Sequence, residues 1–264
     1  IDFITSKQNT TEFTNFNISV AITEKFMEAV QKDEEYELLN PRTKEPFKKI
    51  RAKEIFDLIV ENAWRTGEPG IIFIDRINKD NPTPELGEIE STNPCGEQPL
   101  LPYESCNLGS INLAKMVKQG DDNTSIVDYD HLRETIHNAV RFLDNVIEMS
   151  SFPLPQIEKN TKSNRKIGLG VMGFADMLIQ LKISYNSEDA LNLAGEIMGF
   201  IEKESKNASI NLAKERGSFE NFQLSIYNKN GTPMRNATTT TIAPTGTLSI
   251  IANCSSGVEP LYAI

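Results

Sequence analysis

The chain carries a strictly alternating segment, Thr14-Asn15-Phe16-Asn17-Ile18-Ser19-Val20-Ala21-Ile22, in which every second residue from Phe16 onward is apolar. This period predicts a β-strand with one apolar and one polar face. Thr23 and Glu24 follow directly, and a hydroxyl residue before an acidic first turn predicts that a helix begins here and continues through Val30. A strand that passes straight into a helix indicates an α/β fold.

The rest of the chain continues this alternation. Helices are predicted over residues 51–64, 107–116, 129–149 and 188–215, and short strands over residues 71–74 and 238–242. Residues 91–105 contain three prolines and a glycine and are not expected to form one regular element. The whole pattern favours an α/β architecture with a parallel sheet or a barrel.

A glycine-rich stretch covers residues 166–181, and its Gly168, Gly170 and Gly173 have the Gly-x-Gly-x-x-Gly spacing of a dinucleotide-binding loop. That interpretation is rejected, because the polar residues 160–166 predict no strand in front of the glycines. We expect instead a glycine-rich helix start that packs closely against a neighbouring element.

Composition excludes several classes of function. The formal charge is −10 and no block of Lys or Arg is present, which argues against a nucleic-acid surface. No apolar run approaches the roughly 20 residues that span a bilayer, and no secretion signal opens the chain. Three cysteines are too few for a disulfide scaffold, so a cytoplasmic protein is expected. We interpret the apolar ends of the chain as those of an excerpt from a longer polypeptide.

The most informative segment is Asn93-Pro94-Cys95-Gly96-Glu97. In an extended backbone Asn93, Cys95 and Glu97 project from one side, as an amide, a thiol and a carboxylate that can act as a base. Pro94 removes a backbone donor, and Gly96 lets the backbone approach another group closely. The segment predicts a loop that presents three polar groups to a bound molecule. A surface loop with a chance thiol is the plain alternative.

A second thiol, Cys106, follows without any Cys-x-x-Cys pair. His131 and His137 lie elsewhere on one predicted helix, so no metal site is expected and both are interpreted as helix-surface or packing residues. Two thiols that flank a looped segment leave thiol–disulfide chemistry between Cys95 and Cys106 as one alternative function.

The segment Pro244-Thr245-Gly246-Thr247-Leu248-Ser249 follows a predicted strand and precedes an apolar run that could begin a helix. Hydroxyl groups, a glycine and free backbone N–H groups form a cradle for an anion. The Gly-Lys-Ser/Thr ending of a Walker motif is absent. The segment therefore predicts phosphate binding, with a plain N-cap turn as the alternative.

Together and in this order, these segments resemble the large, catalytic subunits of ribonucleotide reductases. The matching stretches, spread over essentially the whole chain, are residues 16–20, 93–97, 104–113, 165–176, 244–249 and 255–260. The Asn-Pro-Cys-Gly-Glu motif and the short spacing from Cys95 to Cys106 are most similar to those of the adenosylcobalamin-dependent class II. Class I, which takes its radical from a separate metal-containing subunit, is the close alternative.

The resemblance implies that residues 1–264 are a fragment of the catalytic barrel domain, an α/β barrel of ten strands in two parallel five-stranded halves with a central finger loop. It implies reduction of ribonucleotides to deoxyribonucleotides for DNA synthesis, with adenosylcobalamin as cofactor. It further implies a dNTP or ATP effector in the full protein, a thioredoxin- or glutaredoxin-like reductant, and a homodimer as one assembly.

The resemblance also implies roles for individual residues. Cys95 would become a thiyl radical that takes the hydrogen from C3′ of the ribose, with Glu97 as base on the 3′ hydroxyl and Asn93 as a hydrogen-bonding partner of the ribose. Cys106 would be one of two thiols that reduce the 2′ position and end as a disulfide. The substrate would also contact the two small residues of the finger loop and the phosphate loop, namely Pro94, Gly96, Pro244, Thr245, Gly246, Thr247, Leu248 and Ser249.

One part of the family pattern has no match. The second redox cysteine would precede Cys95, no cysteine does so here, and Cys254 does not fit the position. The effector-binding loops are expected upstream and the cysteines that re-reduce the disulfide downstream. We therefore expect the chain alone to be inactive. A non-catalytic nucleotide-binding module is the alternative from another class.

Overall fold

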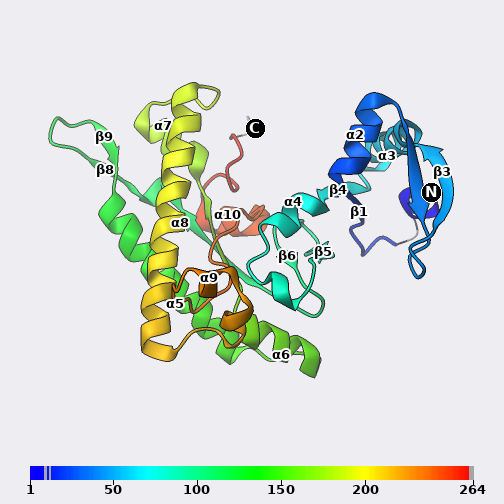
Figure 1. The fold of residues 1–264 in the computed structure, drawn as a ribbon. Coiled ribbons are helices and arrows are strands. Elements are labelled where there is room, and N and C mark those ends of the chain that lie inside the picture. Colours follow the sequence, from blue (N-terminus) through cyan, green and yellow to red (C-terminus); the bar gives the residue numbers. More distant parts are fainter. Residues whose placement is uncertain (9–10, 12, 262–264) are drawn as a thin grey trace. The chain divides into compact units, whose positions relative to one another are not determined.

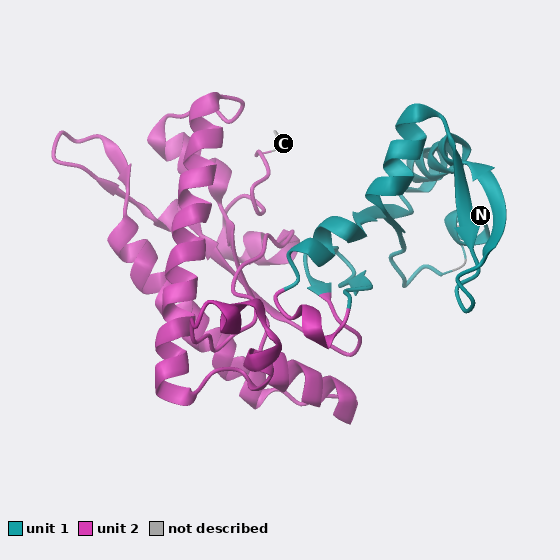
Figure 2. Ribbon diagram, viewed as in Figure 1, with its two compact units in different colours: residues 1–81, 88–99 teal, residues 82–87, 100–264 magenta. Residues whose placement is uncertain are grey.

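The structure, a computed structural model, describes residues 1–8, 11 and 13–261. The chain forms two compact units, of which unit 1 comprises residues 1–81 and 88–99 and unit 2 comprises residues 82–87 and 100–264 (Figure 2). Each unit has an apolar core of its own.

Unit 1 is a small α/β unit. Its elements are α1 (Asp2–Thr5), β1 (Ser19–Ile22), α2 (Glu24–Lys32), β2 (Glu35–Leu39), β3 (Pro46–Arg51), α3 (Ala52–Thr66), β4 (Gly70–Phe73), α4 (Ile74–Lys79) and β5 (Ser91–Thr92), and the two-residue β6 (Pro99–Leu100) follows where the chain passes into unit 2 (Figure 1). Strands β1 and β4 are parallel, whereas β2 and β3 form an antiparallel hairpin. The core residues Ile22, Phe26, Ala29 and Ala52 come from β1, α2 and the start of α3.

The alternating segment at the start of the chain is confirmed as a strand in its second half only, because β1 begins at Ser19. Within β1 the burial follows the predicted period, since Val20 and Ile22 are more buried than their neighbours. The predicted helix start is also confirmed, because Thr23 caps α2 by accepting the N–H of Phe26 at 3.1 Å.

Unit 2 contains the longer elements. They are η1 (Pro84–Leu86), β7 (Asn107–Asn112), η2 (Leu113–Lys115), β8 (Val117–Gln119), β9 (Ser125–Val127), α5 (Tyr129–Met149), α6 (Pro155–Asn164), β10 (Ile167–Met172), α7 (Phe174–Leu181), α8 (Glu188–Arg216), η3 (Glu220–Leu224), α9 (Ile226–Lys229) and α10 (Gly246–Ala252). Helix α5 packs against both β7 and β10, helix α8 packs against α5, and both helices contribute residues to the core (Figure 1). Both helices were predicted from their amphipathic pattern, and both are confirmed.

Two sequence predictions in unit 2 are wrong. The helix predicted over residues 107–116 is strand β7 followed by a short 3-10 turn. The helix start predicted over residues 166–181 is strand β10, and helix α7 begins only at Phe174. Every residue of β10 is buried. A strand covered on both faces has no alternation, so its short apolar run cannot be distinguished from a helix by periodicity.

The parallel pairing that the sequence predicts is present in both units. In unit 2, β7 and β10 are parallel, with Asn107 opposite Ile167. The predicted strand over residues 238–242 is reduced to a parallel bridge between Thr240 and Leu169, alongside β10. The fold is thus mixed α/β, but the strands of the described residues do not close into a barrel. Within the described ranges, no helix is long and apolar enough to cross a membrane.

Candidate functional site

Residues 93–98 of unit 1 form a closed turn. The carbonyl of Asn93 accepts the N–H of Gly96 at 3.0 Å, and its own N–H donates to the carbonyl of Gln98 at 3.1 Å. The side chain adds a third bond, because Asn93 Oδ1 accepts the N–H of Gln98 at 2.9 Å. The second turn position is Pro94, as is common in β-turns. The segment is the loop that the sequence predicts, but its backbone is a tight turn and not the extended one in which all three side chains would share a side.

The turn decides what its residues can do. It places Cys95 at an exposed tip, while Glu97 is partly buried. Gly96 has a φ of +87°, and no described atom lies within 4 Å of the place where a Cβ would be. The glycine therefore serves the positive φ, and the expected close approach to another group is not observed within unit 1. Because Asn93 Oδ1 is engaged inside the turn, Nδ2 is the amide group that can donate to a ligand.

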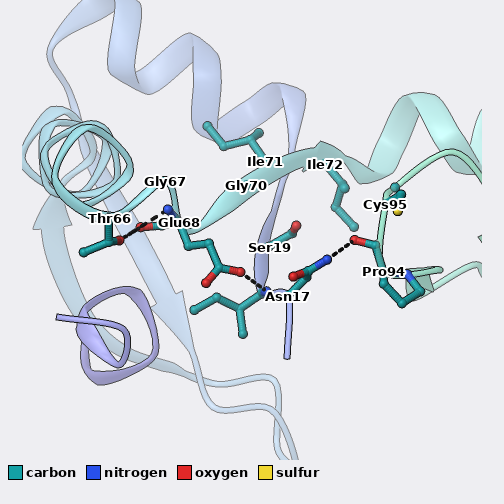
Figure 3. A pocket seen from close by; sticks show the side chains of 12 residues that line it. Asn17, Ser19, Thr66, Gly67, Glu68, Gly70, Ile71, Ile72, Pro94 and Cys95 are labelled. Carbon is teal, nitrogen blue, oxygen red and sulfur yellow. Dashed lines mark hydrogen bonds between the residues drawn. The ribbon is translucent and has the colours of Figure 1, made fainter. Parts of the chain in front are cut away.

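A pocket of about 570 Å³ lies beside this turn and is lined by residues of β1, β4 and the turn itself (Figure 3). Asn17 connects the two sides, since its Nδ2 donates to the carbonyl of Pro94 at 2.9 Å. Asn17 lies in the matching stretch 16–20, but the sequence alone gives it no role. Its position in the polar half of the alternating segment is the signal that could have found it.

The start of β1 is held from the opposite side by Glu68. Its Oε1 accepts the N–H of Ile18 at 3.1 Å, and its Oε2 forms an ion pair with Lys7 at 2.7 Å. The hydrogen bond from Lys7, supported by that of Ile18, holds the pKa of Glu68 below its usual value despite partial burial. The carboxylate therefore stays charged and keeps the pocket wall in place.

Cys106 belongs to unit 2, where it lies directly before β7 and is half-buried. Its Sγ donates to the carbonyl of Asn107 at 3.4 Å. Both neighbours are anchored: the hydroxyls of Ser105 and Thr161 are 2.7 Å apart, and Asn107 Nδ2 donates to the carbonyl of Leu143 at 3.1 Å. The thiol is thus held between two fixed residues.

The phosphate-loop candidate also lies in unit 2 and leads into α10. Thr245 has a φ of 55°, and its Oγ1 accepts the N–H of Gly257 at 2.7 Å. Ser249 Oγ donates to the carbonyl of Gly246 at 3.0 Å and is 2.8 Å from Ser256 Oγ. Both hydroxyl side chains are buried and engaged within the protein. The exposed members of the segment are Pro244, Gly246, Thr247 and Leu248.

The segment after α10 folds back onto the carboxyl end of β10. Ser255 accepts the N–H of Gly173 at 2.7 Å through its carbonyl, and its own N–H donates to Asp176 at 2.6 Å. Ligands of parallel sheets bind outside the carboxyl ends of the strands, and this loop lies at such an end. Burial, reinforced by the nearby charge of Asp176, raises the pKa of Cys254, so this thiol resists forming a thiolate.

The predicted site residues divide between the two units. Residues 93–97 belong to unit 1, whereas Cys106 and residues 244–249 belong to unit 2. Within unit 2, Cys106 precedes β7, whereas residues 244–249 follow the bridged segment around Thr240 on the other side of β10, so they come from opposite ends of segments that β10 separates. All three cysteines are free thiols.

The two histidines lie on α5, as predicted. The Nε2 atom of His137 is 3.1 Å from Glu204 of α8, and the N–H of His131 donates to the capping side chain of Asp128. Across the residues that the structure places, no group of three or more His, Cys, Asp or Glu side chains is arranged to hold a metal ion.

Comparison with known proteins identifies one family. The family model described as "Ribonucleotide reductase, barrel domain" matches residues 1–233. A vitamin B12-dependent ribonucleoside-diphosphate reductase of Thermoplasma acidophilum is 56% identical over 265 residues, which is 100% of this chain and 34% of that protein. A protein of the same name from Mycobacterium tuberculosis is 48% identical over 264 residues, which is 100% of this chain and 37% of the relative.

A more distant relative carries another name. The ribonucleoside-diphosphate reductase subunit alpha of Chlamydia pneumoniae is 32% identical over 257 residues, which is 82% of this chain and 24% of that protein. The chain spans about a third of the length of the first two relatives, whose shares are 34% and 37%.

Proposed function

This chain belongs to the ribonucleotide reductase barrel family, and on that premise we propose that it is part of the catalytic barrel of an adenosylcobalamin-dependent ribonucleotide reductase. In the full-length protein the two parallel strand pairs would be part of a ten-stranded barrel with residues 93–98 as its finger loop. The observation that carries the proposal is the turn that exposes the thiol of Cys95 between Asn93 and Glu97.

The residues of unit 1 fit the proposed cofactor in one respect. A bulky group can act on a thiol only if it reaches Sγ, and Cys95 is exposed at the tip of its turn beside a pocket of about 570 Å³. What adenosylcobalamin supplies when bound is a radical that takes the hydrogen atom of a nearby thiol. In this chain, residues 93–98 would face that group.

The first chemical step would belong to the finger loop. The sulfur radical of Cys95 takes the hydrogen atom from C3′ of the ribose, which leaves the radical on C3′ and a thiol on Cys95. Glu97 takes the proton of the 3′ hydroxyl, and the Nδ2 group of Asn93 donates to the developing carbonyl oxygen. The bond from Asn17 to Pro94 keeps the turn in one geometry, as proximity effects require.

The reduction itself would use Cys106 and a second thiol outside this chain. The 2′ hydroxyl leaves as water with one proton from this pair, and C2′ receives the other hydrogen. The two thiols supply two electrons and become a disulfide, Glu97 returns its proton to the 3′ oxygen, and Cys95 returns its hydrogen atom to C3′. Each turnover then needs a dithiol, of the thioredoxin or glutaredoxin type, to reduce the disulfide.

The substrate phosphates would bind at the start of α10. The first backbone N–H groups of a helix have no partner inside it and can donate to an anion. Gly246 and Thr247 are exposed there, whereas Thr245 and Ser249 hold the shape of the loop. Substrate contact is therefore assigned to the exposed residues. A dNTP or ATP effector, a homodimer and a cytoplasmic location belong to the same proposal for the full-length protein.

Serine variants of the three cysteines test the proposal in the full-length protein. Cys95→Ser and Cys106→Ser are expected to lower kcat at least about a thousandfold, because each removes a group that takes part in the chemistry. Cys254→Ser is the matched control and should retain turnover. Activity that survives in Cys95→Ser would contradict the radical role.

The choice of class has its own test. The full-length protein should reduce ribonucleotides when adenosylcobalamin and a dithiol are added and no second subunit is present. Turnover that depends on a separate metal-containing subunit would assign the chain to class I. Nucleotide binding with no turnover under either condition would favour the non-catalytic module.

A further inference from the structure

The most deeply buried ion pair of unit 2 lies beside the Cys106 segment. Glu104 Oε2 accepts from Lys166 Nζ at 2.6 Å, and both side chains are 1% exposed. The same carboxylate also accepts the N–H of Leu101 at 2.7 Å and the side-chain amide of Asn164. Three donors therefore converge on a carboxylate that lies two residues before the thiol.

The register of the strands places Lys166 level with Cys106. Asn107 and Ile167 are opposite each other at the start of the parallel pair β7–β10. Cys106 and Lys166 are the residues immediately before them, at the same end of two strands that are about 4.8 Å apart. The ion pair thus joins the entry of one strand to the entry of the other, next to the thiol.

Further contacts tie the same segment to α6. Asn160 Nδ2 donates to the carbonyl of Pro102 at 2.9 Å, and the hydroxyls of Thr161 and Ser105 are 2.7 Å apart. Asn164, on the same helix, donates to Glu104. Of these contacts, only the one between Glu104 and Lys166 joins two full charges. A buried ion pair adds little net stability over apolar residues of the same volume, but either charge left alone would be strongly unfavourable. Its effect is to restrict the segment to one arrangement.

We propose that Glu104 and Lys166 are positioning residues for Cys106, which fix its thiol for the reduction step. The proposal rests on the proposed function, because it takes Cys106 to be a reducing thiol. Neither residue is assigned a contact with substrate. Glu104 restrains the chain before the thiol, and Lys166 fixes Glu104 to the strand beside it.

The test uses the full-length protein and the variants Glu104→Gln, Lys166→Met and the double variant Glu104→Gln/Lys166→Met. The readout is the rate at which iodoacetamide modifies each cysteine, followed by mass mapping. Modification of Cys106 should accelerate at least about fivefold in every variant that folds, because its segment opens more often. The rates of Cys95 and Cys254 in the same molecules should stay within about twofold of the wild type. The expected kinetic signature is a lower kcat with an unchanged KM.

The double variant removes both charges and so leaves no single charge buried without a partner. It can therefore be measured even if a single variant does not fold. A matched control is Lys162→Met on α6, which breaks the more exposed ion pair between Lys162 Nζ and Glu158 Oε1, 2.7 Å apart. Cys106 modification at the wild-type rate in the double variant would overturn the positioning role. That failure is distinct from failure of the proposed function, which would appear as turnover in Cys106→Ser.

Discussion

Gly170→Ala is the substitution whose cost follows most directly from the packing of the strand pair. A Cβ at this position would lie 2.4 Å from the carbonyl oxygen of Thr241. That oxygen cannot move freely, because the N–H of Thr241 donates to the carbonyl of Leu169 at 3.2 Å and the N–H of Leu169 donates to Thr239 at 2.9 Å. The added methyl group must therefore push the two backbones apart.

The loss of folding stability in Gly170→Ala has two parts. Insertion of a methyl group into a fully packed site costs about 1–3 kcal/mol through strain. Separation of residues 238–241 from β10 weakens backbone hydrogen bonds worth about 1 kcal/mol each. A total loss near 3 kcal/mol lowers the melting temperature of a domain of this size by about 6–12 °C. Hydrogen exchange of residues 167–172 and 238–242 should accelerate together, because they form one contact.

The matched control is Gly199→Ala on the exposed side of α8, where no described atom lies within 4 Å of the added Cβ. Alanine favours a helix over glycine by about 1 kcal/mol, so this variant should melt at or above the wild-type temperature. Both variants are compared in thermal scans of the full-length protein. If Gly170→Ala melts within about 2 °C of Gly199→Ala, the close approach of Thr241 does not limit this position.

Two further predictions concern hydrogen bonds that the sequence did not reveal. Asn17→Ala removes the hydrogen bond to the carbonyl of Pro94, which is worth about 1 kcal/mol. Iodoacetamide should therefore modify Cys95 several times faster in this variant than in the control Asn15→Ala. Equal rates would show that Asn17 does not position the turn. Burial alone would raise the pKa of Asp144, but the hydrogen bond and charge of Arg165 outweigh it and hold this pKa below its ordinary 3.8. A carboxyl whose pKa is lowered on folding stabilises the fold above its unfolded pKa, and this stabilisation is lost as pH falls through the folded pKa. Asp144→Asn should therefore cost about 3–5 kcal/mol of folding stability at neutral pH, and its melting temperature should depend less on acid pH than that of the wild type.

The helices of unit 2 were predictable because local chemistry and tertiary burial agree in them. Helix α5 has an apolar stripe that meets the core, and Asp128 caps it by accepting the N–H of His131. Helix α8 begins after the capping Ser187 and ends at Gly217. Each of these signals lies within a few residues of the element that it defines, so no long-range information is needed.

The strands of unit 2 were not predictable in the same way. Residues 107–116 and 166–172 are apolar runs interrupted by glycine and small polar residues, and such runs suit a buried parallel strand or a helix equally well. What selects the strand is the partner, because residues 107–112 and 167–172 complete each other's backbone hydrogen bonds. Gly170 shows the same dependence, since its lack of a side chain matters only once the carbonyl of Thr241 lies against it.

The candidate site combines both kinds of information. The residue types at positions 93–97 were evident from the sequence, but the turn that orients them depends on bonds between Asn93 and Gln98 that an extended backbone would not make. Lys166 and Glu104 are 62 positions apart in the chain, so their pairing becomes visible only when β7 and β10 are aligned. The strands that sequence periodicity misassigned are therefore the ones that bring this ion pair to Cys106. A site built on buried strands with glycine inside them departs from local propensity, and such departures are expected where tertiary contacts position reactive groups.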